Sequence, residues 1–377
     1  MIPGITAARL SGARHRAELP LLVLGPSLGT SADALWTACA PDLTDVFDVL
    51  AWDLPGHGHN RTVPAEPFTM AELAAGVLGV VDDVLAERGE LKGGFYYAGD
   101  SVGGCVGLQL MLDSPRRVAA AVLLCTGARI GSPEMWAGRR GQVNVSGTAV
   151  MVAGSAERWF APGFLDAEPQ RGAALLEALR RTDGGGYVQV CAALAEFDVR
   201  GRLREIGVPV LAVAGALDVA TPPALLEEIA DSVADGRLVM LDGVAHLAPA
   251  EAPERVAALL REHLLGEQPP APTAGLRDDV AEVIDRVLGG VLAGGPEADL
   301  DERPGLEPRG RMLVAVAAVV ASGRLDALPA RLLAARAQGV TDDEVREVLV
   351  TAAVHGDPAA AEAAYRIAQR VLATGDA

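Results

Sequence analysis

The chain has 377 residues, half of them apolar and few of them aromatic, and its formal net charge is −18. This length is long for one domain, so we expect two. The negative charge argues against a nucleic-acid partner, whose phosphates need a basic protein face. It would also repel an anionic substrate, so a substrate that carries a carboxylate needs arginines close to its site.

The N-terminus lacks the basic and then apolar layout of a secretory signal peptide. No apolar run approaches the ~20 residues of a membrane-spanning helix. The cysteines are scattered, with no Cys-x-x-Cys pair and no zinc-ligand spacing: Cys39, Cys105, Cys125 and Cys191. We therefore expect a cytoplasmic protein with buried, reduced thiols, no metal, no other cofactor and no membrane partner.

Two short apolar runs open the chain, Ile5–Leu10 and Leu21–Gly25, and both predict strands. The second run leads into Gly25-Pro26-Ser27-Leu28-Gly29-Thr30. A glycine-bearing loop after an early buried strand presents backbone N–H groups that can stabilise an oxyanion. Leu28 is the candidate donor, through its backbone, and an ordinary β-turn is the alternative.

A further strand is predicted over Val49–Trp52, followed by a glycine loop that contains His57 and His59. Two histidines two residues apart suggest metal binding, but the loop supplies no third ligand, so a structural loop is the better interpretation. A Thr-x-x-Glu capping box then predicts a helix over residues 69–87.

The stretch that organises the chain is Gly99-Asp100-Ser101-Val102-Gly103. A β-rich run over residues 95–98 precedes it, and a helical pattern follows over Val102–Leu112. This arrangement is typical of a nucleophile elbow, a sharp strand-to-helix turn that exposes a serine hydroxyl at the sheet edge. The helix N-terminus just after Ser101 offers unpaired N–H groups and a positive dipole end where an oxyanion would form. A glycine-rich turn that happens to contain serine is the alternative.

Beyond the elbow helix, the continuous apolar run Ala119–Leu124 predicts a strand buried on both faces of a parallel sheet. Residues 131–200 lose the strand–helix alternation and contain Trp136, Trp159 and Phe160. We expect a helical insertion there, a lid over the site. Val208–Ala214 restores the strand pattern.

Two polar residues follow the last predicted strands. Asp218 comes just after Val208–Ala214, and His246 comes after Arg237–Leu241, before a helix over residues 253–264. Ser101, Asp218 and His246 each lie past the carboxyl end of a strand, in the order Ser, acid, His. We expect them to form a catalytic triad. Asp242 is a competing acid, but it is too close in sequence to His246 to orient it from a separate loop.

Residues 266–276 form a Pro-rich linker, which separates domain 1–265 from domain 277–377. Strand patterns stop after the linker, and the remaining segments show helical periodicity: Val280–Leu292, Arg311–Ala321, Ala327–Gln338, Asp342–Val354 and Ala359–Leu372. Gly339 is a candidate helix C-cap, and Thr341 with Glu344 predicts a second capping box. The fold expected is an α/β domain followed by a small all-α domain.

Several segments of residues 5–265 carry a family resemblance: Ser27-Leu28-Gly29-Thr30, Asp53-Leu54-Pro55-Gly56-His57-Gly58, Gly99 to Gly104, Ala128-Arg129-Ile130-Gly131-Ser132-Pro133-Glu134-x-Trp136, Thr221-Pro222-Pro223 and Ala245-His246-Leu247. They resemble those of 3-oxoadipate enol-lactonase, an α/β-hydrolase of the β-ketoadipate pathway of aromatic catabolism. The resemblance implies an α/β-hydrolase fold, Ser101 as nucleophile, His246 as base and Asp218 as its orienting acid. It also implies Leu28 and Val102 as the oxyanion donors.

Segments of the C-terminal region match a second family: Arg303-Pro304-Gly305-Leu306-Glu307, Gly339 to Leu349, and Ala364-Tyr365-Arg366-Ile367-Ala368. They resemble 4-carboxymuconolactone decarboxylase, which catalyses the preceding step of the same pathway. Arg331 stands where we expect a family histidine, and His355-Gly356-Asp357-Pro358 replaces an aromatic-Gly-x-Pro stretch.

These resemblances predict a serine hydrolase that opens 3-oxoadipate enol-lactone and acts on a small-molecule lactone. Trp136 of the lid, and Arg129 and Arg139 for a substrate carboxylate, are the candidate binding residues. The C-terminal domain is expected to keep the decarboxylase fold, to be weak or inactive, and to support a homo-oligomer. The alternatives are a bifunctional enzyme with both sites active, and an esterase of other specificity with a C-terminal oligomerisation module.

Overall fold

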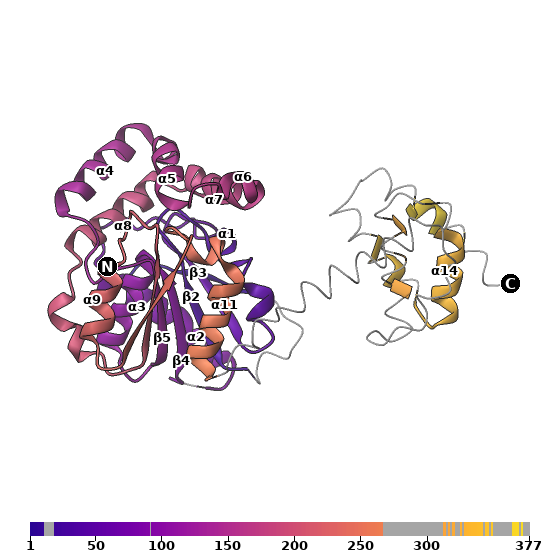
Figure 1. The fold of residues 1–377 in the computed structure, drawn as a ribbon, viewed down its shortest axis with the longest axis horizontal. Coiled ribbons are helices and arrows are strands. Elements are labelled where there is room, and N and C mark those ends of the chain that lie inside the picture. Colours follow the sequence, from indigo (N-terminus) through magenta and orange to yellow (C-terminus); the bar gives the residue numbers. More distant parts are fainter. Residues whose placement is uncertain are drawn as a thin grey trace. The chain divides into compact units, whose positions relative to one another are not determined.

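The computed structural model describes residues 1–10, 19–90 and 92–266, and, further along the chain, residues 312, 313, 316, 319, 320, 325, 328–341, 344–346, 348, 349, 364–368 and 371. The chain divides into two compact units, Met1–Pro272 and Thr273–Ala377 (Figure 1). The predicted linker beyond Gly266, the predicted helix Val280–Leu292 and the His355–Pro358 stretch lie outside the described residues.

The first unit is built on a seven-stranded sheet with the order β1-β3-β2-β4-β5-β6-β7. Its strands are β1 (Thr6–Leu10), β2 (Leu21–Gly25), β3 (Asp48–Asp53), β4 (Phe95–Asp100), β5 (Val118–Leu124), β6 (Val210–Gly215) and β7 (Gly236–Leu241). Every predicted strand is present, with ends within two residues of the prediction. The α/β architecture expected from the alternating pattern is therefore confirmed.

The sheet is parallel from β3 to β7, and β1 is its antiparallel edge strand. β1 pairs with β3, so that Thr6 faces Asp53 and Leu10 faces Val49. Although β1 and β2 are consecutive, they are not neighbours in the sheet. The inner strand β2 is buried at every position, as its unbroken apolar run requires.

Helices cover both faces of the sheet (Figure 1). They are α1 (Ala32–Trp36), α2 (Met70–Glu87), α3 (Val102–Asp113), α9 (Ala224–Ser232), α10 (Ala248–Glu251) and α11 (Pro253–Leu265). α2 packs against α3, and α10 packs against α1 and α11. The predicted capping box at the start of α2 is confirmed. The Thr69 hydroxyl accepts the N–H of Glu72 at 3.2 Å, and the Glu72 carboxylate accepts the N–H of Thr69 at 2.9 Å.

The lid, residues 131–200, is helical as predicted. It contains α4 (Pro133–Ser146), the 3-10 turn η3 (Thr148–Met151), α5 (Val152–Trp159), α6 (Phe164–Ala167), α7 (Pro169–Arg181) and α8 (Gly184–Glu196). These helices gather at one end of the strands, between β5 and β6 in the chain (Figure 1). The 3-10 helix η4 (Arg200–Glu205) then leads into β6.

The second unit contains α14 (Leu328–Ala337) and a buried apolar cluster of Met312, Val316, Val320, Leu328, Leu332, Ala335, Val340, Val345, Leu349, Ala364 and Ala368. Gly339 has φ +80°, and the N–H of Val340 bonds the carbonyl of Ala335 at 3.1 Å, so the predicted helix end is confirmed. The capping box of Thr341 and Glu344 is also present.

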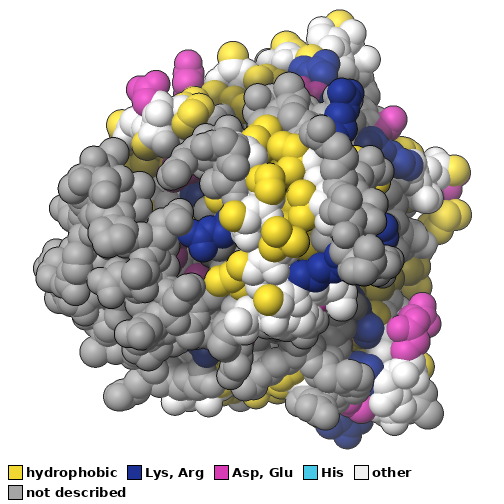
Figure 2. Space-filling model, turned by 90° about the vertical axis from the view of Figure 1, so that its right-hand side faces the viewer, with side chains coloured by type: hydrophobic (Ala, Val, Ile, Leu, Met, Phe, Trp, Pro, Cys, Tyr) yellow, Lys and Arg dark blue, Asp and Glu magenta, His cyan; other side chains and the backbone are white. Residues whose placement is uncertain are grey.

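On the face shown in Figure 2, Lys or Arg side chains border a strip of apolar side chains, and much of that face belongs to residues that the structure does not describe.

Within the part of the chain that is described, no helix combines the length and the apolar character that crossing a membrane requires.

Candidate active site

Ser101 occupies the sharp turn between β4 and α3, with φ +53° and ψ −114°. This backbone conformation is unfavourable for a residue with a side chain, so the surrounding structure must hold it. The turn needs glycine on both sides. A Cβ at Gly99 would collide with the backbone of Gly103, and one at Gly103 would lie 2.7 Å from the carbonyl carbon of Gly25. The predicted elbow geometry is therefore present.

Three hydrogen bonds fix this elbow to the sheet. Ser101 donates its N–H to the carbonyl of Leu124 at 2.9 Å, and its own carbonyl accepts the Thr126 hydroxyl at 2.6 Å. The buried Tyr97 hydroxyl donates to the carbonyl of Gly103 at 2.7 Å. Burial makes each of these bonds costly to break, because an unpaired polar group would be left in the core. The strained serine turn is thus held in place by β4 and by the residues at the end of β5.

His246 lies between Ser101 and Asp218 in the structure. Its Nε2 is 3.1 Å from the Ser101 Oγ, and its Nδ1 is 2.8 Å from the Asp218 Oδ2. All three side chains are buried. Thr221 supports the acid by donating its hydroxyl to the same oxygen at 2.6 Å, and its N–H to the other oxygen at 3.0 Å. The hydrogen bonds therefore run continuously from a carboxylate, through an imidazole, to a hydroxyl.

Asp218 is suited to carry a negative charge there. Its burial alone would raise the pKa of its carboxyl. The charge of His246 and the hydrogen bonds from His246 and Thr221 outweigh that effect, and the pKa is lowered. The competing acid, Asp242, is exposed, and its backbone carbonyl accepts a bond from the Arg255 guanidinium at 3.0 Å.

The two predicted oxyanion donors belong to adjoining segments. Val102 is the first residue of α3, so its N–H has no acceptor within the helix. Leu28 lies in a tight turn in which the Thr30 hydroxyl bonds the carbonyl of Ser27 at 2.8 Å. Among the described residues, the N–H of Leu28 has no protein acceptor. The N–H of Gly103 bonds the carbonyl of Pro26 at 3.0 Å and so ties this turn to the elbow.

The lid contacts the loop that carries His246. The N–H of His246 donates to the carbonyl of Trp159 at 3.1 Å, and the side chain of Trp159 reaches the backbone of Gly29 beside Leu28. The carboxylate of Glu251 also accepts hydrogen bonds from both segments, from the N–H of Ala161 in the lid and from the N–H of Ala245 beside His246. We did not predict this residue from the sequence. A glutamate five positions after a candidate base, in an apolar segment, is a signal that could have found it.

The predicted binding residues have different surroundings. Trp136 is buried and donates its indole N–H to the carbonyl of Ile130 at 2.7 Å. The Arg139 guanidinium lies 5.2 Å from the centre of the Trp136 ring, a cation–π contact. Arg129 lies 3.8 Å from the carboxylate of Asp198 and is partly exposed. The structure thus brings Trp136 and Arg139 together and pairs Arg129 with an acid instead.

A further arginine of the lid, Arg158, was not predicted. Its guanidinium lies 3.5 Å from the Ser155 hydroxyl, and among the described residues it forms no ion pair with an acid. Burial and the nearby charge of Arg139 lower the pKa of Arg158. Burial raises the pKa of Tyr187 to about 12, and the nearby charges of Arg139 and Arg158 oppose that rise. Arg139, Arg158 and Tyr187 therefore lie near enough to one another in the lid to interact electrostatically.

His57 is a buried part of the glycine loop. Its Nδ1 donates to the carbonyl of Pro55 at 2.9 Å, and its ring stacks on Tyr187 with 6.2 Å between centres. Burial lowers the pKa of His57 to about 4, so the ring is neutral at pH 7. No group of three or more His, Cys, Asp or Glu side chains within the described ranges is arranged to hold a metal.

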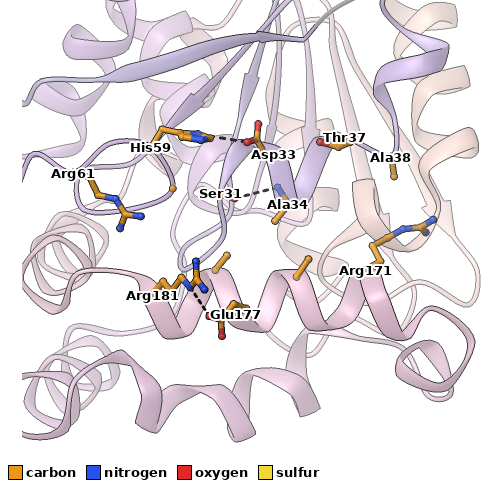
Figure 3. Close-up of a pocket in the computed structure, with 13 residues that line it drawn as sticks. Ser31, Asp33, Ala34, Thr37, Ala38, His59, Arg61, Arg171, Glu177 and Arg181 are labelled. Carbon is orange, nitrogen blue, oxygen red and sulfur yellow. Dashed lines mark hydrogen bonds and ion pairs between the residues drawn. The ribbon is translucent and has the colours of Figure 1, made fainter. Parts of the chain in front are cut away.

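A groove of about 660 Å³ lies outside the Ser101 site, between α1 and α7 (Figure 3). Its walls carry charges of both signs. Arg181 pairs with Glu177 on one wall, and His59 lies 3.6 Å from Asp33 on the other. In all, three arginines and two carboxylates line the groove, so its walls carry a small excess of positive charge.

Comparisons with known proteins agree with this geometry. Residues 22–259 match the alpha/beta hydrolase family, and residues 279–370 match the carboxymuconolactone decarboxylase family. The chain is 30% identical to 3-oxoadipate enol-lactonase 2 of Acinetobacter baylyi over 239 residues, which are 63% of this chain and 86% of that protein.

Two solved structures are similar as well. The enol-lactonase from Burkholderia xenovorans LB400 is 31% identical with a TM-score of 0.64, and the match covers 69% of this chain and 96% of that one. A hydrolase from Pseudomonas aeruginosa PA01 is 32% identical with a TM-score of 0.63, and the match covers 69% of this chain and 94% of that one. The fold, the serine elbow and the family match over most of the first unit lead to one conclusion: this chain belongs to the alpha/beta hydrolase family.

Proposed function

We propose that the first unit is a serine hydrolase that opens 3-oxoadipate enol-lactone to 3-oxoadipate. The observation that carries this proposal is the position of His246, within hydrogen-bonding distance of both the Ser101 hydroxyl and the Asp218 carboxylate. Similarity to enol-lactonases of two organisms, at 30% and 31% identity, supports the choice of substrate.

Acylation begins with attack of the Ser101 Oγ on the lactone carbonyl carbon, while His246 Nε2 takes the hydroxyl proton. Asp218 keeps the other imidazole proton on Nδ1 and stabilises the imidazolium that forms. The negative charge on the former carbonyl oxygen is bound by the N–H groups of Leu28 and Val102. Each such donor lowers the barrier by about 3 kcal/mol.

Collapse of the tetrahedral intermediate breaks the ring C–O bond. The leaving group is an enolate, which is more stable than an ordinary alkoxide, and it takes the proton from His246 Nε2 to become the ketone, which leaves His246 neutral again. It stays tethered to the acyl group, because both parts belong to one carbon skeleton. A water molecule then attacks the acyl carbon, His246 takes its proton, and Ser101 is released with 3-oxoadipate.

The substrate also has a free carboxylate, which must be bound inside a chain of net charge −18. We propose that Arg139 and Arg158 bind it, with Trp136 and Tyr187 as the apolar and polar walls beside them. Two half-buried guanidinium groups close together repel one another, and an anion between them would relieve that repulsion. Arg129 is the weaker candidate, since Asp198 already accompanies it.

The family match of residues 279–370 favours a second candidate function, the decarboxylation of 4-carboxymuconolactone by the second unit. We propose instead that this unit keeps the fold, is weak or inactive as a decarboxylase, and supports self-association of the chain. The expected loss of activity follows from Arg331, which stands where we expect a family histidine. A guanidinium stays protonated near pH 7 and cannot act as a general base.

One assay separates these functions. Purified full-length protein is given 4-carboxymuconolactone and its decarboxylated enol-lactone, and each conversion is followed separately. We expect rapid hydrolysis of the enol-lactone and little consumption of 4-carboxymuconolactone. Efficient conversion of both would make the protein bifunctional. Activity on p-nitrophenyl esters with none on the enol-lactone would make it an esterase of other specificity.

A further inference from the structure

A single carboxylate bonds both the lid and the loop of the catalytic base. Glu251 is the last residue of α10. Its Oε2 accepts the N–H of Ala161 at 2.7 Å, and its Oε1 accepts the N–H of Ala245 at 3.0 Å. Ala161 follows α5 of the lid, and Ala245 immediately precedes His246. The two oxygens of one side chain therefore span the boundary between lid and base.

The same two segments are joined a second time, directly. The N–H of His246 donates to the carbonyl of Trp159, at the end of α5. The segment 159–161 of the lid is thus fixed to the segment 245–246 by three hydrogen bonds, two of them through Glu251.

Glu251 is set in place by its own helix. α10 packs between α1 and α11. The carbonyl of Ala250 accepts the Arg171 guanidinium of α7 at 2.9 Å, and the carbonyl of Pro249 accepts the Cys39 thiol at 3.3 Å. The carboxylate is therefore attached to a short element that contacts both the body and the lid.

The protonation of Glu251 is a balance of opposing effects. Burial raises the pKa of its carboxyl above the ordinary value, although the N–H groups of Ala161, Ala245 and Leu247 and the charge of His246 oppose that rise. The buried Asp100 carboxyl lies near enough to interact with it electrostatically. An ionised carboxylate is the better acceptor for backbone N–H groups, and such bonds are about twice as strong as those between neutral groups.

We infer that Glu251 is a positioning residue, which holds the His246 loop against the lid so that His246 Nε2 stays within reach of the Ser101 hydroxyl. It acts through its two backbone partners and takes no proton in the reaction. This inference rests on the proposed function only in taking Ser101 as the nucleophile and His246 as its base, and it does not depend on which lactone is the substrate.

The test compares Glu251→Gln with Glu254→Gln in the full chain. A glutamine at 251 keeps one carbonyl oxygen, but its NH₂ group meets the other N–H and cannot accept from it. Glu254 is exposed, three residues away, and forms no hydrogen bond or ion pair among the described residues, so its variant is the matched control.

The readout is phosphorylation of Ser101 by diethyl p-nitrophenyl phosphate. The serine oxygen bonds to phosphorus, p-nitrophenolate leaves, and His246 takes the serine proton, so the rate constant reports the Ser101–His246 geometry without any lactone. We expect Glu251→Gln to lower this rate constant and kcat for p-nitrophenyl acetate at least tenfold, and Glu254→Gln to leave both within twofold. A purely structural role would lower the melting temperature and leave the rate constant of the folded protein unchanged.

A second variant keeps the test decisive if Glu251→Gln does not fold. Ala161→Pro removes only the N–H of the lid segment, and the extended backbone of Phe160 (φ −117°, ψ 142°) is compatible with a following proline. We expect a fall of at least threefold in the same rate constant. Phosphorylation within twofold of wild type in whichever variant folds would overturn the inference. Wild-type protein that phosphorylates normally but leaves the enol-lactone intact would contradict the proposed function alone.

Discussion

Asp100 and Asp218 are two buried carboxyl groups near Ser101, and their pKa values shift in opposite directions. Burial and the charge of Asp218 raise the pKa of Asp100 well above its usual range, whereas the charge and hydrogen bond of His246 lower that of Asp218. Neither oxygen of Asp100 has a hydrogen-bond partner among the described residues. The environments therefore assign the negative charge to the carboxylate that faces His246.

Replacement of Asp218 by Asn should impair turnover far more than the same change at Asp242. An asparagine in place of Asp218 could not hold the imidazole proton on Nδ1, so His246 would present the wrong tautomer to Ser101. We expect a loss of kcat of at least a hundredfold for Asp218→Asn and less than threefold for Asp242→Asn, measured on the enol-lactone. Equal losses, or the reverse order, would move the acid role to Asp242.

Asp100→Asn should change how stability depends on pH. Because the raised pKa means that the folded chain binds this proton more tightly than the unfolded chain, wild-type Asp100 favours folding below its ordinary pKa of 3.8. That contribution is lost as pH rises through the raised value, and Asn has no such dependence. Relative to wild type, the variant should gain unfolding free energy as the pH rises from 5 to 9. Denaturant titrations at both pH values measure it, and a constant difference would refute it.

Ser101→Ala should abolish enol-lactone hydrolysis and leave the fold intact, with a loss of several orders of magnitude, because triad members act as a unit. Ser101→Gly should be equally inactive but should melt at a higher temperature than Ser101→Ala, since glycine tolerates φ +53° without strain. Hydrolysis above about a tenth of the wild-type rate in either variant would exclude Ser101 as nucleophile.

Much of this site could be predicted because its signals are local. The Gly99-x-Ser101-x-Gly103 spacing, the buried run before Asp218 and the strand before His246 each depend on a few neighbouring residues. Parallel strands then bring their carboxyl ends to one edge of the sheet. The capping boxes of α2 and of Thr341 are local as well, and both are present.

Pairings between distant segments could not be predicted in this way. No local pattern in β1 indicates that its antiparallel partner is β3. The contact of Arg129 with Asp198, and the approach of Arg158 to Arg139, depend on how the lid helices pack. The bonds of Glu251 to Ala161 and Ala245 likewise arise only when the lid meets the body. Composition and periodicity contain no information on such contacts.

Arg139 and Arg158 of the lid should determine how tightly the enol-lactone binds. Arg139→Met and Arg158→Met each remove a cation from the proposed carboxylate site and keep the aliphatic length, so KM for the enol-lactone should rise about tenfold or more. Turnover of p-nitrophenyl acetate, which has no free carboxylate, should change less than threefold. Arg180→Met is the control, since Arg180 is exposed and paired with Glu177. Equal effects on both substrates would contradict the assignment.

Truncation after Gly266 tests the second unit. The sheet, the lid and the triad all belong to residues before that point, so lactonase turnover should stay within about twofold. If the second unit supports self-association, the mass measured by light scattering should fall by more than the removed residues account for. Efficient conversion of 4-carboxymuconolactone by the full chain, lost on truncation, would show a bifunctional enzyme.

The burial of all four cysteines has a consequence for following how the molecule opens. Burial raises the pKa of Cys105 and Cys191 to about 12, so neither thiol reacts while its surroundings stay closed. Cys191 lies in α8 of the lid, whereas Cys105 lies in α3 behind the elbow. Alkylation of the native protein therefore proceeds at two separate rates. The rate at Cys191 reports opening of the lid and the rate at Cys105 reports unfolding of the sheet, so comparing them distinguishes local opening from global denaturation.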